Sequence, residues 1–191
     1  MVTARHKHGV AALSGAVALA AVLAGCSGSN DGDSKPSQGV STPAPATSSA
    51  DPQAAEKAAV LKAYEGLTAA EARTYATAKL DPELEKYAAH KALSDIKVTL
   101  FYHQQQGTVM KGDVTRKPDV TALNTESEPL KAVVTDCADS SRYDEVNAKT
   151  GKVKELKSPG PRRHVVTATA QRSKSGAWVF YTYTIERGRT C

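Results

Sequence analysis

The sequence has little of what metal and nucleophile chemistry usually needs. Cysteine occurs only three times in 191 residues, and aromatic residues make up 5% of the chain. It contains no Cys-x-x-Cys or His-x-x-x-His spacing, no Gly-rich phosphate loop and no nucleophile elbow. We therefore expect no metal site and no cofactor.

A strong charge of one sign is also missing. The net charge is +5, and the basic residues are scattered, with the densest cluster at Arg162, Arg163 and His164. Surfaces that bind nucleic acids are more strongly basic and interleave aromatic side chains with the basic ones. We expect no nucleic-acid partner.

Long hydrophobic runs are absent apart from one near the amino terminus. This run, Val10 to Gly25, carries no charge and follows a short basic start that contains Arg5 and Lys7. As a helix it would span about 24 Å, short of the roughly 30 Å hydrocarbon core of a bilayer. The layout is typical of a secretory signal and not of a permanent membrane span.

The apolar run ends in Leu23-Ala24-Gly25-Cys26, which resembles the lipobox of bacterial lipoproteins. The resemblance implies that residues 1–25 are a lipoprotein signal peptide, cut before Cys26, and that the Cys26 thiol receives diacylglycerol. Two acyl chains hold a protein on a membrane, whereas one gives only marginal binding. We expect the membrane as a partner, with the protein on its extracytoplasmic face. The alternative is an ordinary signal peptide cut nearby, with Cys26 present by chance.

Residues 27–50 are rich in Ser, Gly, Pro and Thr, and Val40 is their one large aliphatic residue. Such a segment cannot bury enough apolar area to offset the entropy of ordering it, so we expect a disordered tether. Whether its Ser and Thr residues are glycosylated stays open. The chain thus divides into a signal (1–25), a lipidated cysteine with its tether (26–50) and one folded domain (51–191).

Within the domain, two helix starts are marked by an acid followed by proline, at Asp51-Pro52 and Asp81-Pro82. The first helix is Ala-rich, and the second is predicted to run until Gly107 ends it. Short β-branched and aromatic runs then follow, separated by turn residues. The order predicts an α+β domain, with amino-terminal helices packed in a strongly curved antiparallel sheet of four to six strands.

The lipobox, the helix pair, "DCADSS" at 136–141 and "ERGRTC" at 186–191 together resemble actinobacterial cell-envelope lipoproteins with a nuclear transport factor 2-like domain. In that fold, helices pack in the mouth of a cone-shaped sheet. The resemblance implies a pocket, for which Tyr64, Tyr181 and Tyr183 are our candidates. The fold alone does not decide the function. Our leading hypothesis is a non-enzymatic protein that binds a small hydrophobic ligand or a cell-wall partner. The alternatives are a polyketide-cyclase-like or dehydratase-like enzyme and a structural spacer with a filled cone.

Asp136 is the one candidate for acid or base chemistry. Strand alternation in "KAVVTDC" places it on the same face as Ala132 and Val134, which would put its carboxyl group in the cone. The favoured interpretation is that the strand has already ended and Asp136 caps a turn. Asp139, Asp144 and Glu145 then belong to a solvated acidic loop.

With Cys26 acylated, Cys137 and Cys191 remain as an even pair in an oxidising compartment. We predict a disulfide between them. The alternative is two free thiols.

Overall fold

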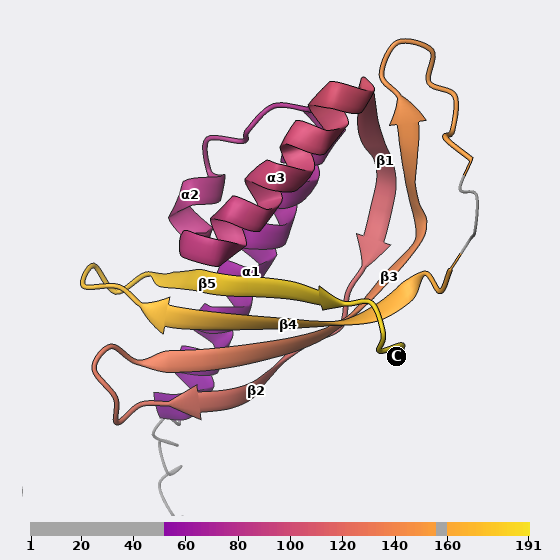
Figure 1. Cartoon of the computed structure of the whole chain (residues 1–191). Coiled ribbons are helices and arrows are strands. Elements are labelled where there is room, and N and C mark those ends of the chain that lie inside the picture. The colour runs from indigo at the N-terminus through magenta and orange to yellow at the C-terminus, as the bar shows by residue number, and fades with distance from the viewer. Residues whose placement is uncertain (1–51, 156–159) are drawn as a thin grey trace, which may run out of the picture. The chain divides into compact units, whose positions relative to one another are not determined.

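The computed structural model describes residues 52–155 and 160–191 (Figure 1). The signal peptide, Cys26 and the tether lie outside the described residues, and their assignment stays a prediction. Within the described part, no helix is long and apolar enough to cross a membrane.

Helix α1, Pro52–Thr77, begins at the predicted proline and runs unbroken past Gly66. One of its faces supplies buried residues of the core: Val60, Ala63, Tyr64, Leu67, Ala70 and Thr74. Their spacing of three and four residues is that of one helical face. A neighbouring stripe of α1 faces the cavity described below.

The second predicted helix is two helices, so the prediction of one continuous helix to Gly107 was wrong. They are α2, Leu84–Tyr87, and α3, His90–Gln106, which ends at Gly107 in the left-handed conformation as predicted. Between them Ala88 is extended and bridges Phe180, and the Ala89 amide donates to the Phe180 carbonyl at 2.9 Å. The chain leaves the helical path because these bonds cover the free edge of strand β5.

Five antiparallel strands form one sheet, as the α+β prediction required. They are β1 (Thr108–Thr115), β2 (Pro118–Asn124), β3 (Lys131–Asn147), β4 (Arg163–Arg172) and β5 (Trp178–Glu186). The order is β1-β3-β4-β5, with β2 also paired to β3. One stretch of β3, residues 131–136, pairs with β2, and a later stretch, 139–147, pairs with β1 (Figure 1).

Strand β3 is therefore much longer than predicted and includes every residue assigned to the acidic loop. Strands β2 and β1 pair in succession with the same edge of β3, so its backbone hydrogen bonds continue past the turn residues Asp139 to Ser141. These residues therefore do not end the strand. Asn147 does close a turn, because its side chain accepts from the amides of Lys149 and Thr150.

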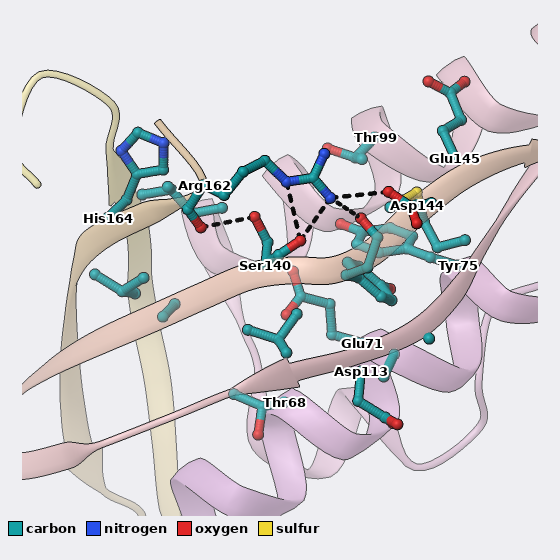
Figure 2. Close-up of a pocket in the computed structure, with 18 of the residues that line it drawn as sticks. Thr68, Glu71, Tyr75, Thr99, Asp113, Ser140, Asp144, Glu145, Arg162 and His164 are labelled. Carbon is teal, nitrogen blue, oxygen red and sulfur yellow. Dashed lines mark hydrogen bonds and ion pairs between the residues drawn. The ribbon is translucent and has the colours of Figure 1, made fainter. Parts of the chain in front are cut away.

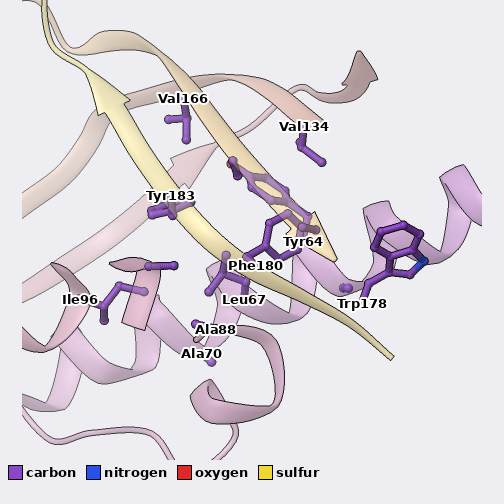
Figure 3. Packing of buried hydrophobic residues seen from close by; sticks show 14 of the residues in the cluster. Tyr64, Leu67, Ala70, Ala88, Ile96, Val134, Val166, Trp178, Phe180 and Tyr183 are labelled. Atoms are coloured by element: carbon purple, nitrogen blue, oxygen red, sulfur yellow. The ribbon is translucent and has the colours of Figure 1, made fainter. Parts of the chain in front are cut away.

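The core lies between α1 and the inner face of the sheet (Figure 3). Tyr64 and Phe180 are the largest of its fully buried side chains, and their rings meet edge to face at 5.5 Å. Alternate residues of the long strands point into it: Ala132 and Val134 from β3, and Val166, Ala168 and Ala170 from β4.

Candidate functional site

A cavity of about 1280 Å³ lies between α1, α3 and the sheet (Figure 2). Alternate residues of two strands line the cavity: Met110, Gly112, Val114 and Arg116 from β1 and the residue after it, and Tyr183, Ile185 and Arg187 from β5 and the residue after it. From α1 come Glu65, Thr68, Ala69, Glu71, Ala72 and Tyr75, and from α3 Thr99 and His103. The spacer interpretation required a cone filled by side chains, and this cavity is open.

One guanidinium group, that of Arg116, lies at the inner wall between two carboxylates. Its Nη1 donates to Asp136 Oδ2 at 3.0 Å, and its Nη2 lies 3.6 Å from Glu71 Oε2. Asp136 is fully buried, and the side chains of Glu71 and Arg116 are 11% and 18% exposed. Burial alone would lower the pKa of Arg116, but its anionic and phenolic neighbours raise it, so the group stays protonated.

Two tyrosines complete the network as bridges between Arg116 and the acids. Tyr64 accepts from Arg116 at 3.4 Å and donates to Asp136 at 3.0 Å. Tyr183 accepts from Arg116 at 2.9 Å and donates to Glu71 at 3.0 Å. Burial raises the pKa of both hydroxyls, so both remain protonated donors.

The two acids are not equally compensated. Asp136 has a direct bond to Arg116 and also accepts from the Lys117 amide at 2.6 Å. Glu71 has the longer contact to Arg116 and lines the cavity. Burial raises the pKa of Glu71, although Arg116 and hydrogen bonds from Tyr183 and Tyr75 partly lower it. Glu71 is thus the cavity's candidate for a carboxyl group that changes protonation state.

A second polar group lies farther along the wall, at the end of α3. Thr108 donates to Glu145 Oε1 at 2.7 Å, so its oxygen is left to accept from His103 Nδ1 at 3.1 Å. Lys154 pairs with the same Glu145 oxygen at 3.1 Å. Burial lowers the pKa of His103 despite the nearby Glu145 carboxylate. The neutral ring with its proton on Nδ1 satisfies all of these contacts.

Asp136 lies inside β3 on the same face as Ala132 and Val134, so the favoured interpretation as a turn cap was wrong. Its three partners are Tyr64, Arg116 and the Lys117 amide. It is not among the residues that line the cavity. The alternation argument placed Asp136 correctly, and the residue now has a positioning role, because it fixes Arg116.

The predicted acidic loop is also corrected. Asp144 pairs with Arg162 at 3.0 Å, Asp139 lies 3.8 Å from Arg163, and Glu145 belongs to the His103 group. All three acids lie on β3. Each of them has a basic partner, where a free, solvated turn was expected.

Of the three pocket candidates, Tyr183 lines the cavity and Tyr64 lies just behind it in the network. Tyr181 does not line it. It stacks on His90 with ring centroids 4.7 Å apart. The register of β4 and β5 shifts between Thr169–Thr182 and Ala170–Phe180, so Tyr181 is an extra residue in the ladder. Because of this bulge, Tyr181 and Tyr183 do not share a face of β5, although they are two residues apart.

Glu71, Arg116 and His103 were not predicted. Glu71 carried a weak signal, since it lies four residues before Tyr75 on a helix. Arg116 carried none, because its partners come from α1, β3 and β5. Within residues 52–155 and 160–191, no three His, Cys, Asp or Glu side chains are grouped to hold a metal ion.

The structure brings Cys137 and Cys191 to disulfide distance, with Cα atoms 5.8 Å apart. Cys137 lies in β3, and Cys191 follows β5. This distance agrees with the predicted pairing of the two cysteines.

No family model matches the chain, and no curated protein matches it. One similar solved structure is the intermembrane space region of the chloroplast protein ARC6, with 12% identity, a TM-score of 0.42 and coverage of 74% of this chain and 98% of that one. Another is a ketosteroid isomerase-like protein from Erwinia carotovora atroseptica, with 14% identity, a TM-score of 0.41 and coverage of 67% and 92%. At these values the likenesses say nothing about activity, which must be argued from the cavity.

Proposed function

We propose that this chain is an exported, lipid-anchored cell-envelope protein that binds a small ligand in the cavity of its α+β domain. The observation that supports ligand binding is the cavity itself. Its volume of about 1280 Å³ suits a small molecule, and apolar, aromatic and charged side chains from the helices and the sheet converge on it.

An enzyme of the polyketide-cyclase-like or dehydratase-like kind is the second candidate. Glu71 favours it, because a buried carboxyl group with a raised pKa beside two tyrosine hydroxyls is suited to general acid or base catalysis. The two candidates differ in what happens to the bound compound. A binding protein returns it unchanged, whereas an enzyme converts it and loses the conversion in Glu71→Gln.

Blocking the cavity tests ligand binding. Ala72 on α1 lines it, and Ala72→Trp should fill space near Glu71. Ala59→Trp is the matched control, since Ala59 is exposed on the same helix and does not line the cavity. Each protein is purified from its own cells and extracted with solvent, and the extracts are compared by mass spectrometry. A compound present with the wild type and Ala59→Trp but lost with Ala72→Trp supports binding. Equal extracts from all three contradict it.

The proposed location rests on the Leu-Ala-Gly-Cys match and is tested separately. Cys26→Ser should move the protein from the membrane fraction to the soluble fraction and abolish incorporation of labelled palmitate. A Cys26→Ser protein that still sediments with membranes, together with an unlabelled wild type, contradicts the anchor and leaves ligand binding untouched.

A further inference from the structure

The buried network at the inner wall carries an uncompensated negative charge. Two carboxylates, Asp136 and Glu71, share the single guanidinium of Arg116. Asp136 has the shorter contact to Arg116 and also accepts from a backbone amide. Glu71 is therefore the less compensated of the two carboxylates. A buried charge that is only partly compensated is costly, and burial raises the pKa of Glu71 although Arg116 and the hydrogen bond from Tyr183 lower it.

Among the ion pairs of the described residues, Glu71 has none with a cation at the rim of the cavity, where Lys154, Arg162 and Arg187 lie. Lys154 is paired with Glu145 at 3.1 Å, and Arg162 is paired with Asp144 at 3.0 Å. Six carboxylates but only four Lys or Arg side chains line the cavity, although the chain as a whole has a net charge of +5. The cavity is therefore acidic within a basic protein.

The surroundings of Glu71 suit a cation with an apolar body. Tyr75, Tyr143 and Tyr183 line the same space, and burial raises the pKa of all three hydroxyls, so their rings stay neutral. Neutral aromatic rings attract cations through their faces. An anionic ligand would instead meet Glu71, since the Arg116 donors already point at Asp136, Tyr64 and Tyr183.

We infer that the cavity takes a ligand with a protonated amine, whose ammonium group lies against the Glu71 carboxylate while its apolar body lies among the tyrosines. This inference rests on the proposed ligand-binding function. It names the charge class of the ligand and assigns Glu71 as the residue that selects it.

Three matched compounds test the charge: 2-phenylethylamine, 2-phenylethanol and 3-phenylpropionate, each titrated by ligand-observed NMR or calorimetry. The wild type should bind the amine at least about tenfold more tightly than the other two, as one charge-assisted bond provides. Glu71→Gln should reduce that preference to about twofold or less. Asp113→Asn is the matched control, because Asp113 is an exposed acid that also lines the cavity, and it should keep the preference.

The possible outcomes distinguish a failure of this inference from a failure of the proposed ligand-binding function. Equal binding of the three compounds, tighter binding of the propionate, or an amine preference that survives Glu71→Gln overturns the inference but leaves a cavity that binds small molecules. If none of the three binds at millimolar concentration, the inference also fails, and the comparison of Ala72→Trp with Ala59→Trp still decides the function.

A measurement on the wild type covers the case in which Glu71→Gln does not fold. Carboxyl ¹³C NMR should show the amine lowering the pKa of Glu71, because the ammonium group stabilises the ionised form. The neutral 2-phenylethanol should not lower it. An unchanged titration of Glu71 in saturating amine contradicts the contact.

Discussion

At the scale of single residues, Asp136 and Glu71 show how two acids of one network can differ in role. Asp136 is buried behind the cavity wall and satisfied by three donors. Glu71 lies at the wall, has the longer contact to Arg116 and accepts a hydrogen bond from Tyr183 at 3.0 Å. The first acid positions the guanidinium group, and the second is left to meet a ligand.

Asp136→Ala should lower the free energy of unfolding by about 3 kcal/mol or more, because it leaves the Arg116 charge buried without its closest partner. Asp136→Asn keeps the shape and part of the hydrogen bonding, so it should cost less. Denaturant unfolding of both variants beside the wild type measures the difference. A loss below about 1 kcal/mol in Asp136→Ala would show that Glu71 alone can compensate Arg116.

His103 should make stability depend on pH. Its pKa in the folded protein is lowered, first by burial, so between that pKa and the unfolded value of 6.5 only the unfolded chain binds the proton. This stabilisation is complete above pH 6.5 and is lost as the pH falls through that window, by at most about 1.4 kcal/mol per pH unit. His103→Gln should flatten the slope between pH 7.5 and pH 5 in unfolding measurements. Identical slopes would contradict the assignment.

Sequence reasoning succeeded where the chemistry was local. Alternation alone placed Asp136 on the face of Ala132 and Val134, since three residues of one strand need no information from elsewhere. It failed for Arg116, because nothing near position 116 indicates that α1, β3 and β5 deliver its four partners. Buried charge networks join distant segments, so their membership is a property of the fold.

At the scale of elements, the errors share one cause, which is pairing between segments far apart in the sequence. The break between α2 and α3 exists because Ala88 and Ala89 bond to Phe180 on β5. Strand β3 outlasts its turn residues because β1 and β2 pair with it in succession. The bulge at Tyr181 is likewise a feature of the β4–β5 ladder. Element type was predictable from periodicity, but element ends were not.

Gly112 is the tightest point of the β1–β3 ladder. It has φ +92°, and an added Cβ would lie 1.8 Å from the Arg142 carbonyl oxygen, a backbone atom that cannot rotate away. Gly112→Ala should therefore cost more than about 2 kcal/mol of stability. It should also distort the cavity, which Gly112 lines.

Gly107→Ala is the matched comparison for Gly112→Ala. Gly107 also has a positive φ, of +61°, but a Cβ there meets nothing within 4 Å. Its replacement should cost only the backbone strain, about 1 kcal/mol. If thermal unfolding shows equal losses in the two variants, the contact with Arg142 is not the cause.

At the scale of the whole molecule, the Cys137–Cys191 pair ties the carboxyl terminus to β3. Within the described residues, the segment after β5 has few other attachments to the sheet, one of them the Val165 amide, which donates to the Arg189 carbonyl at 3.0 Å. A disulfide here is expected of an exported protein, because cytosolic thiols are kept reduced. Detection of the bridge in the isolated protein would therefore support the proposed export.

The disulfide should be present in the protein isolated from its own cells and absent when the same chain is made without its signal in a reducing cytosol. Intact mass should then rise on reduction by the mass of two hydrogen atoms, and Cys191→Ser should lower the free energy of unfolding by about 4 kcal/mol, given the sequence separation of 54 residues. Cys26→Ser serves as the control, since it removes a cysteine that is not part of the pair and should leave the bridge intact. A wild-type mass that reduction does not change would mean two free thiols, and the carboxyl terminus would then be held by its backbone bonds alone.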